Sequence, residues 1–423
     1  MLEIGKIKNH SSEIIKSLQK RGIDVTDDLS ELLNLNQKRI TNQQKLDLIL
    51  TDSNQIAQHI GQLAKEQKFS TIDKLKTKAS TLKEESKKLI QKAKDLESNI
   101  RELLISIPNT PHNEVPSGNS EKDNIIVFEW GDLKKSESLF AHWELAEKYN
   151  IIDFKQGAKI TGSGFPIYIG KGARLQRGLI NFFLDYNIKA GYKEYSPPFF
   201  VNENSAFNTG QIPDKEGMMY HIVNDNLYAI PTAEVPITNM FSNHKFKADD
   251  LPIKCTAYSP CFRREAGSYG KEVRGLNRLH QFDKVEIVEI CQPEESYQIL
   301  DKMVEHVSEL LKKLELKFRI VKLCGGDLGF TSALTYDFEV YAPAQKKWLE
   351  VSSVSNFETF QSNRLNLKVV NKDKPNSLCH TLNGSSLALP RIIAAILEQN
   401  QKKEKIILPD VLSKYLGFYE ITI

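Results

Sequence analysis

The hydrophobic positions of this 423-residue chain follow two different periods, and the first of them belongs to a long N-terminal stretch. Between residues 28 and 107, apolar side chains recur at alternating steps of three and four, in one run at 46–63 and another at 75–103. This spacing is that of a coiled-coil seam. The segment between the two runs breaks the phase and offers Ser70 or Thr71 as a helix cap. We therefore expect an antiparallel helical hairpin with arms of about 35 residues, each on the order of 50 Å long.

From about residue 155 onward the hydrophobic pattern changes to that of a mixed fold. Residues 172–190 form an amphipathic helical pattern, and further helical patterns lie at 293–314 and 386–400. Short segments that alternate apolar and polar residues lie among them, as expected for half-buried antiparallel strands. We therefore predict an α+β fold, in which an antiparallel β-sheet flanked by helices follows the N-terminal coiled-coil arm. The sequence has no strand–GxGxxG–helix unit and no GxxxxGK[ST] loop, which excludes a Rossmann or P-loop nucleotide site.

The distribution of charge bears on the function of the predicted helical hairpin. The chain carries a formal net charge of only +3, so binding of nucleic acid would depend on local basic patches. Such a patch lies at 71–95, where eight lysines accompany four acidic residues. A lysine-rich pair of helices suits contact with a phosphate backbone. The same face also fits plain solvation of a packing or dimerisation helix, and the composition alone leaves both interpretations open.

Cysteine usage and the N-terminus indicate the compartment. The five cysteines are scattered and form no CxxC pair, so we expect neither a disulfide framework nor a zinc site, and a reducing cytosol is the default. The N-terminal residues contain an early acid and lack a signal-peptide cleavage site. No apolar run approaches the roughly 20 residues that span a bilayer. We therefore predict a cytoplasmic protein without a membrane partner.

A cluster of cations surrounds the segment CFRREAGSYGKEVRGLNRLHQFDKVEIVE, which begins at Cys261. If this segment is strand, loop and strand, Arg263 and Glu265 share one face of the first strand and Arg264 points the other way. Arginines bind phosphate oxygens, an aromatic ring stacks on a base, and a glutamate accepts from an amine or neutralises an ammonium. These are the components of an ATP site beside an amino-acid site, although ordinary surface ion pairs are the alternative. The return strand would add a further set on one face: Arg278, His280, Phe282, Lys284 and Glu286.

Two later segments supply further candidates. In WLEVSSVSN, Glu350 together with Ser353 forms an oxygen-rich edge that suits Mg²⁺. Arg391 follows a glycine-containing turn near the start of a helix, a position that favours a clamp on a terminal phosphate. The sequence shows no Ser-His-Asp constellation, and we interpret His280 as a structural residue rather than a general base.

These segments resemble the three motifs of class II aminoacyl-tRNA synthetases. FRRE has the form of motif 2, GSSLALPRIIAAILEQ resembles motif 3, and the helix followed by YSPPFFV resembles motif 1, with Pro198 at its proline. The finer similarity is to seryl-tRNA synthetases, in TGQIP, PTAEVPITN, TYDFEVYAPAQ, EVSSVSNFETFQSNR and HTLNGSSLALPR. The N-terminal arm and SIPNTPHNEVP also match, so the resemblance covers essentially the whole chain.

The resemblance implies a serine–tRNA ligase that works in two steps. L-serine and ATP form seryl-adenylate, and serine then passes to the 3′-terminal ribose of tRNA(Ser), or of tRNA(Sec) where one exists. ATP with Mg²⁺ is the expected cofactor, and a homodimer is expected through motif 1, with Pro198 at the interface. Residues 1–110 would be a tRNA-binding domain with the arm at about 28–107, and residues 111–423 the catalytic domain.

The resemblance also assigns roles to individual residues. Arg263 is expected at the α-phosphate of ATP, Glu265 at the adenine amino group and Phe282 on the adenine ring. Arg278 and Arg391 are expected at the γ-phosphate, and Arg263, Glu265 and Arg391 are the catalytic set. The expected ATP-binding residues are Arg263, Arg264, Glu265, Arg278, Phe282, Glu350, Ser353 and Arg391, with Mg²⁺ on Glu350 and Ser353. The expected serine-binding residues are Thr232, Glu234, Glu286, Asn383 and Ser385.

Two positions depart from the family pattern, and two other functions are alternatives. Asp214 follows TGQIP where the family frequently has lysine, and Ser386 stands where it often has glycine. One alternative is a synthetase paralogue that activates an amino acid for a carrier protein. The long arm argues against it, because such a partner has no long variable stem to grip. The other is a non-enzymatic RNA-binding coiled-coil scaffold, which leaves the clustered arginines and glutamates unexplained.

Overall fold

The computed structural model consists of two compact units, which we call the helical unit and the sheet unit. The structure describes residues 1–133, 139–214, 217–265, 274–371 and 375–423. The helical unit comprises Leu2–Lys16 and Asp24–Pro108, and the sheet unit comprises Met1, Ser17–Ile23 and Asn109–Ile423. Among the described residues, no helix is both long and apolar enough to cross a membrane.

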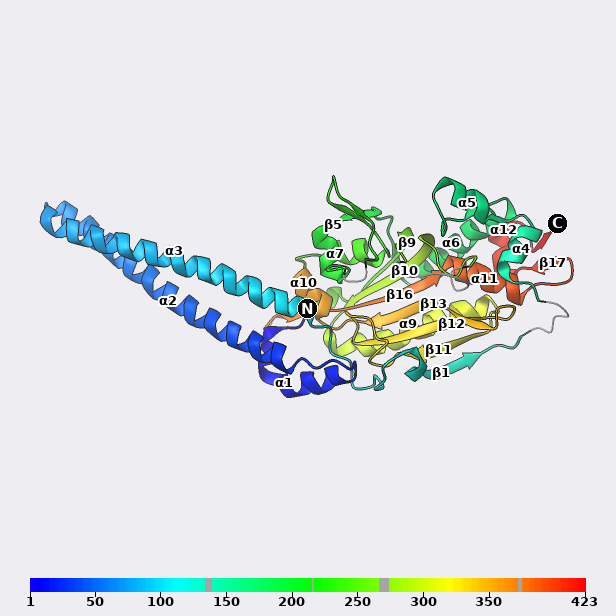
Figure 1. Cartoon of the computed structure of the whole chain (residues 1–423), viewed down its shortest axis with the longest axis horizontal. Coiled ribbons are helices and arrows are strands. Elements are labelled where there is room, and N and C mark those ends of the chain that lie inside the picture. Colours follow the sequence, from blue (N-terminus) through cyan, green and yellow to red (C-terminus); the bar gives the residue numbers. More distant parts are fainter. Residues whose placement is uncertain (134–138, 215–216, 266–273, 372–374) are drawn as a thin grey trace. The chain divides into compact units, whose positions relative to one another are not determined.

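The helical unit is built around two long helices that pack side by side as a hairpin (Figure 1). The predicted seams explain this packing, because the seam positions at 46–63 and 75–103 are buried or half-buried while most of their neighbours are exposed. Asn42 adds a polar contact between the helices, since its Nδ2 donates to the carbonyl of Leu89 at 2.9 Å. The predicted antiparallel hairpin is thereby confirmed. The helices are α1 (Ile4–Gln19), α2 (Thr26–Lys65) and α3 (Phe69–Ser106).

The predicted cap of the second long helix is wrong. Helix α3 begins at Phe69, so Ser70 and Thr71 already lie inside it, and Lys68 occupies the N-cap position without a side-chain cap bond. The chain reverses earlier than the sequence indicated, because Gln67 adopts a φ of 58°. The eight lysines of the basic patch are all exposed on α3.

The sheet unit is organised around one eight-stranded sheet, and neighbouring strands in it are antiparallel except for the pair β4 and β9. This arrangement confirms the predicted α+β class with an antiparallel sheet. In spatial order the strands are β1 (Ile125–Trp130), β11 (Phe318–Lys322), β12 (Leu334–Ala342), β13 (Lys347–Asn356), β16 (His380–Ala388), β10 (Gln281–Cys291), β9 (Ile253–Phe262) and β4 (Lys193–Glu194).

The two faces of the sheet differ in what covers them, and strand β10 shows this most clearly. Its residues Val285 and Ile287 point into the main hydrophobic core, to which several helices contribute. Val288, on the opposite face, packs in a smaller core beside a short helix, and this face also carries Glu286. The long helices of the main core are α6 (Lys171–Lys189), α9 (Ser296–Lys313) and α11 (Leu389–Gln399), and the opposite face carries α8 (Glu234–Asn239) and α10 (Phe360–Leu365).

Short elements complete the sheet unit around this frame. The remaining helices are α4 (His142–Lys148), α5 (Phe154–Ile160), α7 (Glu203–Thr209) and α12 (Ser413–Leu416). The remaining strands form small sheets: β2 (Ile152–Asp153) with β3 (Ile167–Tyr168), β5 (Phe200–Asn202) with β7 (Leu227–Ala229) and β6 (His221–Ile222), β15 (Ser377–Leu378) with β14 (Lys368–Val370) and β8 (Lys245–Lys247), and β17 (Lys405–Ile407) with β18 (Glu420–Thr422).

Candidate active site

Two buried glutamates and one asparagine form the centre of a polar cluster on the face opposite the main core. Asn383 on β16 donates from Nδ2 to Glu234 Oε2 and to Glu286 Oε1, at 2.9 Å in both cases. The hydroxyl of Thr232 accepts from the backbone N–H of Glu234 at 3.2 Å, and Ser385 lies directly opposite Glu286 in the ladder of β10 and β16. The structure therefore brings together all five residues that the sequence predicts for serine binding.

The charges of this cluster are held in a low-dielectric environment. Burial, together with repulsion from Glu286, raises the pKa of Glu234 to about 7. Burial also raises the pKa of Glu286, and the nearby Lys284 ammonium, 2.5 Å from Glu286 Oε2, opposes that rise. A lysine thus partly neutralises one glutamate, whereas Glu234 has neutral amide partners. A cationic group that entered the cluster would find its countercharge at Glu234.

Two further polar side chains hold Glu234 in position, and the sequence analysis predicted neither of them. Gln361 on α10 donates from Nε2 to Glu234 Oε1 at 2.7 Å, and its own Oε1 accepts from the Thr381 hydroxyl at 2.8 Å. Both residues lie in segments that carry the family resemblance. The local sequence around a polar residue such as Gln361 does not distinguish a buried partner from an exposed side chain, so neither residue was predicted.

The segment after β9 carries the residues predicted for ATP. The backbone N–H of Arg263 donates to the carbonyl of His280 at 2.9 Å, and its guanidinium lies over the Phe282 ring, 5.3 Å from the centroid. The alternation of β9 does not continue to Glu265, because Glu265 adopts a φ of 47°. The argument that Arg263 and Glu265 share a face of one strand is therefore wrong, although Glu265 still meets Arg278, with its Oε2 3.3 Å from Nη1.

Arg264 and Asp214 are connected through one short backbone segment. The Arg264 side chain is exposed, and its backbone N–H donates to the carbonyl of Met218 at 2.9 Å. The carboxylate of Asp214 accepts from the N–H groups of Met218 and Met219, at 2.9 Å and 2.8 Å. Asp214 thus stabilises the backbone that holds Arg264, which gives this departure from the family pattern a structural role.

Oxygen atoms gather where β12, β13 and α11 meet. The hydroxyl of Ser353 donates to Glu350 Oε1 at 3.3 Å, and Arg391 Nη1 donates to the carbonyl oxygen of Glu350 at 2.7 Å. Asp337 lies opposite Ser353 in the ladder, and its buried Oδ1 has no hydrogen-bond partner among the described residues. Burial and the charge of Glu350 raise the pKa of Asp337. The predicted magnesium residues Glu350 and Ser353 are therefore adjacent, and Asp337 places a third oxygen-bearing side chain beside them.

This oxygen set fits Mg²⁺, which usually takes one or two carboxylates and completes its coordination with water and substrate phosphates. The ranges that the structure describes contain no cluster of three or more His, Cys, Asp or Glu side chains suited to a metal. Asp337 was not predicted. An acidic residue inside the alternating strand TYDFEV is unusual at a buried position, and this pattern could have indicated a functional side chain.

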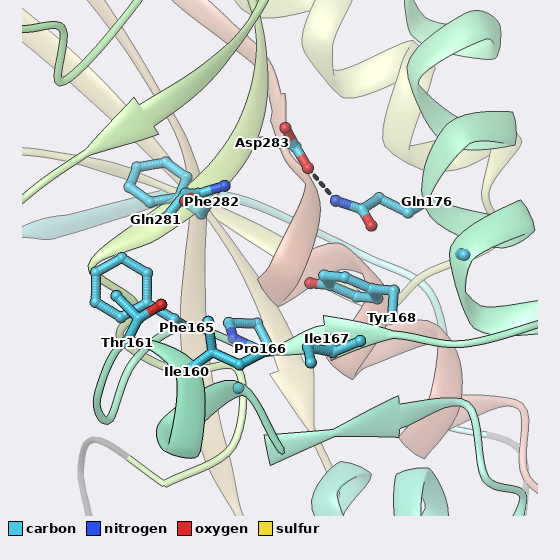
Figure 2. Close-up of a pocket in the computed structure, with 12 residues that line it drawn as sticks. Ile160, Thr161, Phe165, Pro166, Ile167, Tyr168, Gln176, Gln281, Phe282 and Asp283 are labelled. Atoms are coloured by element: carbon cyan, nitrogen blue, oxygen red, sulfur yellow. Dashed lines mark hydrogen bonds between the residues drawn. The ribbon is translucent and has the colours of Figure 1, made fainter. Parts of the chain in front are cut away.

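A separate cleft of about 380 Å³ lies on the other side of β10, between α5, β3 and α6 (Figure 2). Phe282 contributes to its lining from the predicted ATP site. Asp283 points into this region, where it accepts from the Gln176 amide, drawn as a dashed line in Figure 2, and from the Tyr258 hydroxyl at 2.7 Å. The cleft therefore adjoins Phe282, and neither Glu234 nor Glu286 lines it.

His280 packs beside this region in a structural setting. Its ring stacks on Phe165, with centroids 5.4 Å apart, and its Nδ1 is 2.8 Å from the Tyr220 hydroxyl. At Ser386, the other departure from the family pattern, the hydroxyl donates to Asn187 Oδ1 at 2.9 Å in the interior. Both side chains are thus accommodated by hydrogen-bonding or stacking partners within the fold.

Comparison with known proteins places the whole chain in one family. Residues 1–111 match the seryl-tRNA synthetase N-terminal domain, and residues 220–400 match the class II tRNA synthetase core domain of the G, H, P, S and T enzymes. A serine–tRNA ligase from Salinibacter ruber is 46% identical over 100% of this chain and 99% of its own length.

Solved structures give the same result. A seryl-tRNA synthetase from Pyrococcus horikoshii, complexed with ATP, superposes with a TM-score of 0.92 at 33% identity, over 100% of this chain and 99% of that one. A cytoplasmic serine–tRNA ligase from Naegleria fowleri, in complex with AMP, superposes with a TM-score of 0.87 at 25% identity, with the same coverage. The chain therefore belongs to the seryl-tRNA synthetase family of class II aminoacyl-tRNA synthetases.

Proposed function

We propose that this protein is a serine–tRNA ligase, which activates L-serine with ATP and transfers it to the 3′-terminal ribose of tRNA(Ser). The observation that carries the proposal is the cluster in which Asn383 bridges Glu234 and Glu286 beside Thr232. Such a small, polar and acidic cluster suits an amino acid with an ammonium group and a hydroxyl, because a site that hydrogen-bonds a hydroxyl discriminates against analogues that lack it.

The two glutamates divide the recognition of serine. Glu234 has a pKa of about 7, and among the described residues it has no cationic partner within hydrogen-bonding distance. The serine ammonium therefore stabilises its ionised form on binding. Glu286 already has Lys284 as its countercharge, so it is the better acceptor for the neutral hydroxyl. Asn383 holds both carboxylates in place and thereby fixes the distance between the two subsites.

The first chemical step needs positioned charge rather than a general base. The serine carboxylate is ionised at neutral pH, and its oxygen attacks the α-phosphorus while the bond to the β-phosphate oxygen breaks and pyrophosphate leaves. Arg263 binds the α-phosphate, and Arg278 and Arg391 bind the terminal phosphate. When ATP binds, the adenine ring replaces the guanidinium of Arg263 on the face of Phe282. Glu265 leaves its contact with Arg278 and accepts a hydrogen bond from the adenine amino group instead.

Magnesium and tRNA complete the proposed reaction. Glu350, Ser353 and Asp337 would hold Mg²⁺, which when bound supplies positive charge to the phosphates. In the second step the 3′-terminal ribose hydroxyl of tRNA attacks the carbonyl carbon of the seryl-adenylate, and AMP leaves. The exposed lysines on α3 support contact with the tRNA backbone by the arm at about 28–107.

The domain roles and the assembly are part of the same proposal. We assign tRNA binding to residues 1–110 and catalysis to residues 111–423. A homodimer would form through α6 and the segment that contains the exposed Pro198, and the exposed Ile188 on α6 adds apolar surface to this region. The five free cysteines, all buried, support a reducing cytoplasm.

Serine-dependent ATP–pyrophosphate exchange without tRNA tests the proposed adenylation. Serine should support exchange, whereas alanine, which lacks the hydroxyl, should have a kcat/KM about 10⁴-fold lower. Comparable exchange with alanine would contradict the assignment of the hydroxyl subsite at Glu286.

A further inference from the structure

A buried histidine–glutamate pair lies behind the candidate ATP site, and no catalytic step uses it. His142 on α4 and Glu398 on α11 are both fully buried, and His142 Nδ1 is 3.0 Å from Glu398 Oε1. The other ring nitrogen, Nε2, lies 2.8 Å from the backbone nitrogen of Leu276. The pair thus connects the helix that carries Arg391 with the segment that precedes Arg278.

The hydrogen bonds determine which ring nitrogen of His142 carries the proton. The backbone N–H of Leu276 can only donate, so Nε2 must be the unprotonated nitrogen that accepts from it. Nδ1 therefore carries the hydrogen and donates to Glu398. Glu398 therefore fixes the orientation and the tautomer of His142. Through Nε2, the ring in turn positions the backbone N–H of Leu276.

Glu398 is held rigidly by further donors. Its Oε1 accepts from the backbone N–H of His142 at 3.1 Å and from Gln345 Nε2 at 2.7 Å, while Oε2 accepts from the backbone N–H of Ala344 at 3.1 Å. Gln345 extends the network, because its Oε1 accepts from Asn277 Nδ2 at 2.8 Å. Every one of these groups donates, so both oxygens of the ionised carboxylate act as acceptors.

The network holds the backbone on which an arginine of the ATP site rests. The carbonyl of Asn277 accepts from Arg391 Nε at 3.0 Å, and Arg278 is the next residue in the chain. Gly275 shows how closely this backbone approaches the histidine. It adopts a φ of 69°, and a Cβ placed there would lie 2.3 Å from His142 Nε2.

We propose that His142 and Glu398 are positioning residues for adenylation, which fix residues 274–278 so that Arg278 and Arg391 meet the terminal phosphates of ATP. The inference rests on the proposed function, since it takes these two arginines as the phosphate clamp. Because AMP has no terminal phosphates, the pair affects the binding of ATP and leaves the binding of AMP unchanged.

Calorimetric dissociation constants for ATP and AMP test this in the full-length protein. His142→Phe keeps a ring but removes both hydrogen bonds, and Gly275→Ala keeps the pair but displaces the backbone. Either variant should weaken ATP binding on the order of tenfold, as expected for the loss of one charge-assisted contact, and leave AMP binding within about twofold. The matched control is Gln399→Leu on the same helix, which removes buried hydrogen bonds to the carbonyls of Lys317 and Tyr341 and should leave both constants unchanged.

Equal weakening of ATP and AMP, or no weakening of ATP beyond that of Gln399→Leu, would overturn the positioning role. Arg391→Ala separates this failure from that of the proposed function, because it should itself remove the preference for ATP over AMP. If Arg391→Ala leaves the preference intact, the clamp assignment is wrong and the inference fails with it. If Arg391→Ala removes the preference but His142→Phe and Gly275→Ala do not, the clamp stands and only the positioning role is refuted.

Discussion

Replacement of Glu234 by glutamine should stabilise the free protein at alkaline pH and weaken serine binding at the same time. The pKa of this carboxyl is raised from 4.5 to about 7, by burial first and by Glu286 second. The difference of about 2.5, at about 1.36 kcal/mol for each pH unit, corresponds to roughly 3 kcal/mol that ionisation of Glu234 costs the folded state. Glutamine does not ionise, so the variant avoids this cost.

The sign of the pH dependence follows from proton binding. The native state holds the Glu234 proton more tightly than the unfolded state, so its contribution to the free energy of unfolding is fully present below about pH 4.5. That contribution is lost as the pH rises to about 7. The unfolding free energy of Glu234→Gln, relative to the native sequence, should therefore increase by up to about 3 kcal/mol between pH 4.5 and pH 8.

Denaturant unfolding at the two pH values measures the stability effect, and pyrophosphate exchange at pH 8 measures KM for serine. Loss of a charged contact to the ammonium should raise that KM about 10- to 100-fold. Glu289→Gln is the matched control for serine binding, because Glu289 is a buried glutamate on β10 whose pKa burial also raises, and it lies on the face of that strand opposite to Glu286. A pH-independent stability difference would refute the electrostatic reasoning, and an unchanged KM for serine would refute the role of Glu234.

Four further variants test other parts of the account. Arg263→Ala should reduce pyrophosphate exchange at least 100-fold, whereas Arg264→Ala, at an exposed side chain, should retain most of it, as steady-state kinetics would show; equal losses would contradict the assignment. Asp337→Asn should raise the Mg²⁺ concentration required for half-maximal exchange, measured by magnesium titration, and an unchanged requirement would remove Asp337 from the metal site. Deletion of residues 28–107 should spare exchange but abolish tRNA charging, and charging at the native rate would contradict the role of the arm.

The helical hairpin and the sheet class were predictable from the sequence because their signals are local. The seams at 46–63 and 75–103 repeat every seven residues, and a coiled coil buries the same positions that the repeat marks. Alternation within the strands likewise indicates which residues share a face, and it correctly grouped Phe282 and Glu286. The five serine-binding candidates came from the family resemblance, and the register of β10 and β16 shows why Glu286, Asn383 and Ser385 meet.

Other features depend on contacts or backbone conformations that no local pattern encodes. Glu265 adopts a positive φ, which its sequence neighbours do not require. The sequence analysis therefore extended the strand alternation of β9 beyond its actual end at Phe262. The network of His142 and Glu398 joins residues separated by 256 positions, and each appears in sequence as an ordinary helical residue. Gln361 was missed for the same reason, since its partner Glu234 lies 127 residues earlier in the chain.

The most direct test of the central claim is an aminoacylation assay with purified tRNA and each of the twenty amino acids in turn. The account predicts that serine is attached in an ATP-dependent reaction and that the charged species is tRNA(Ser). Preferential charging with another amino acid, or a folded protein that binds ATP but charges no tRNA, would contradict it.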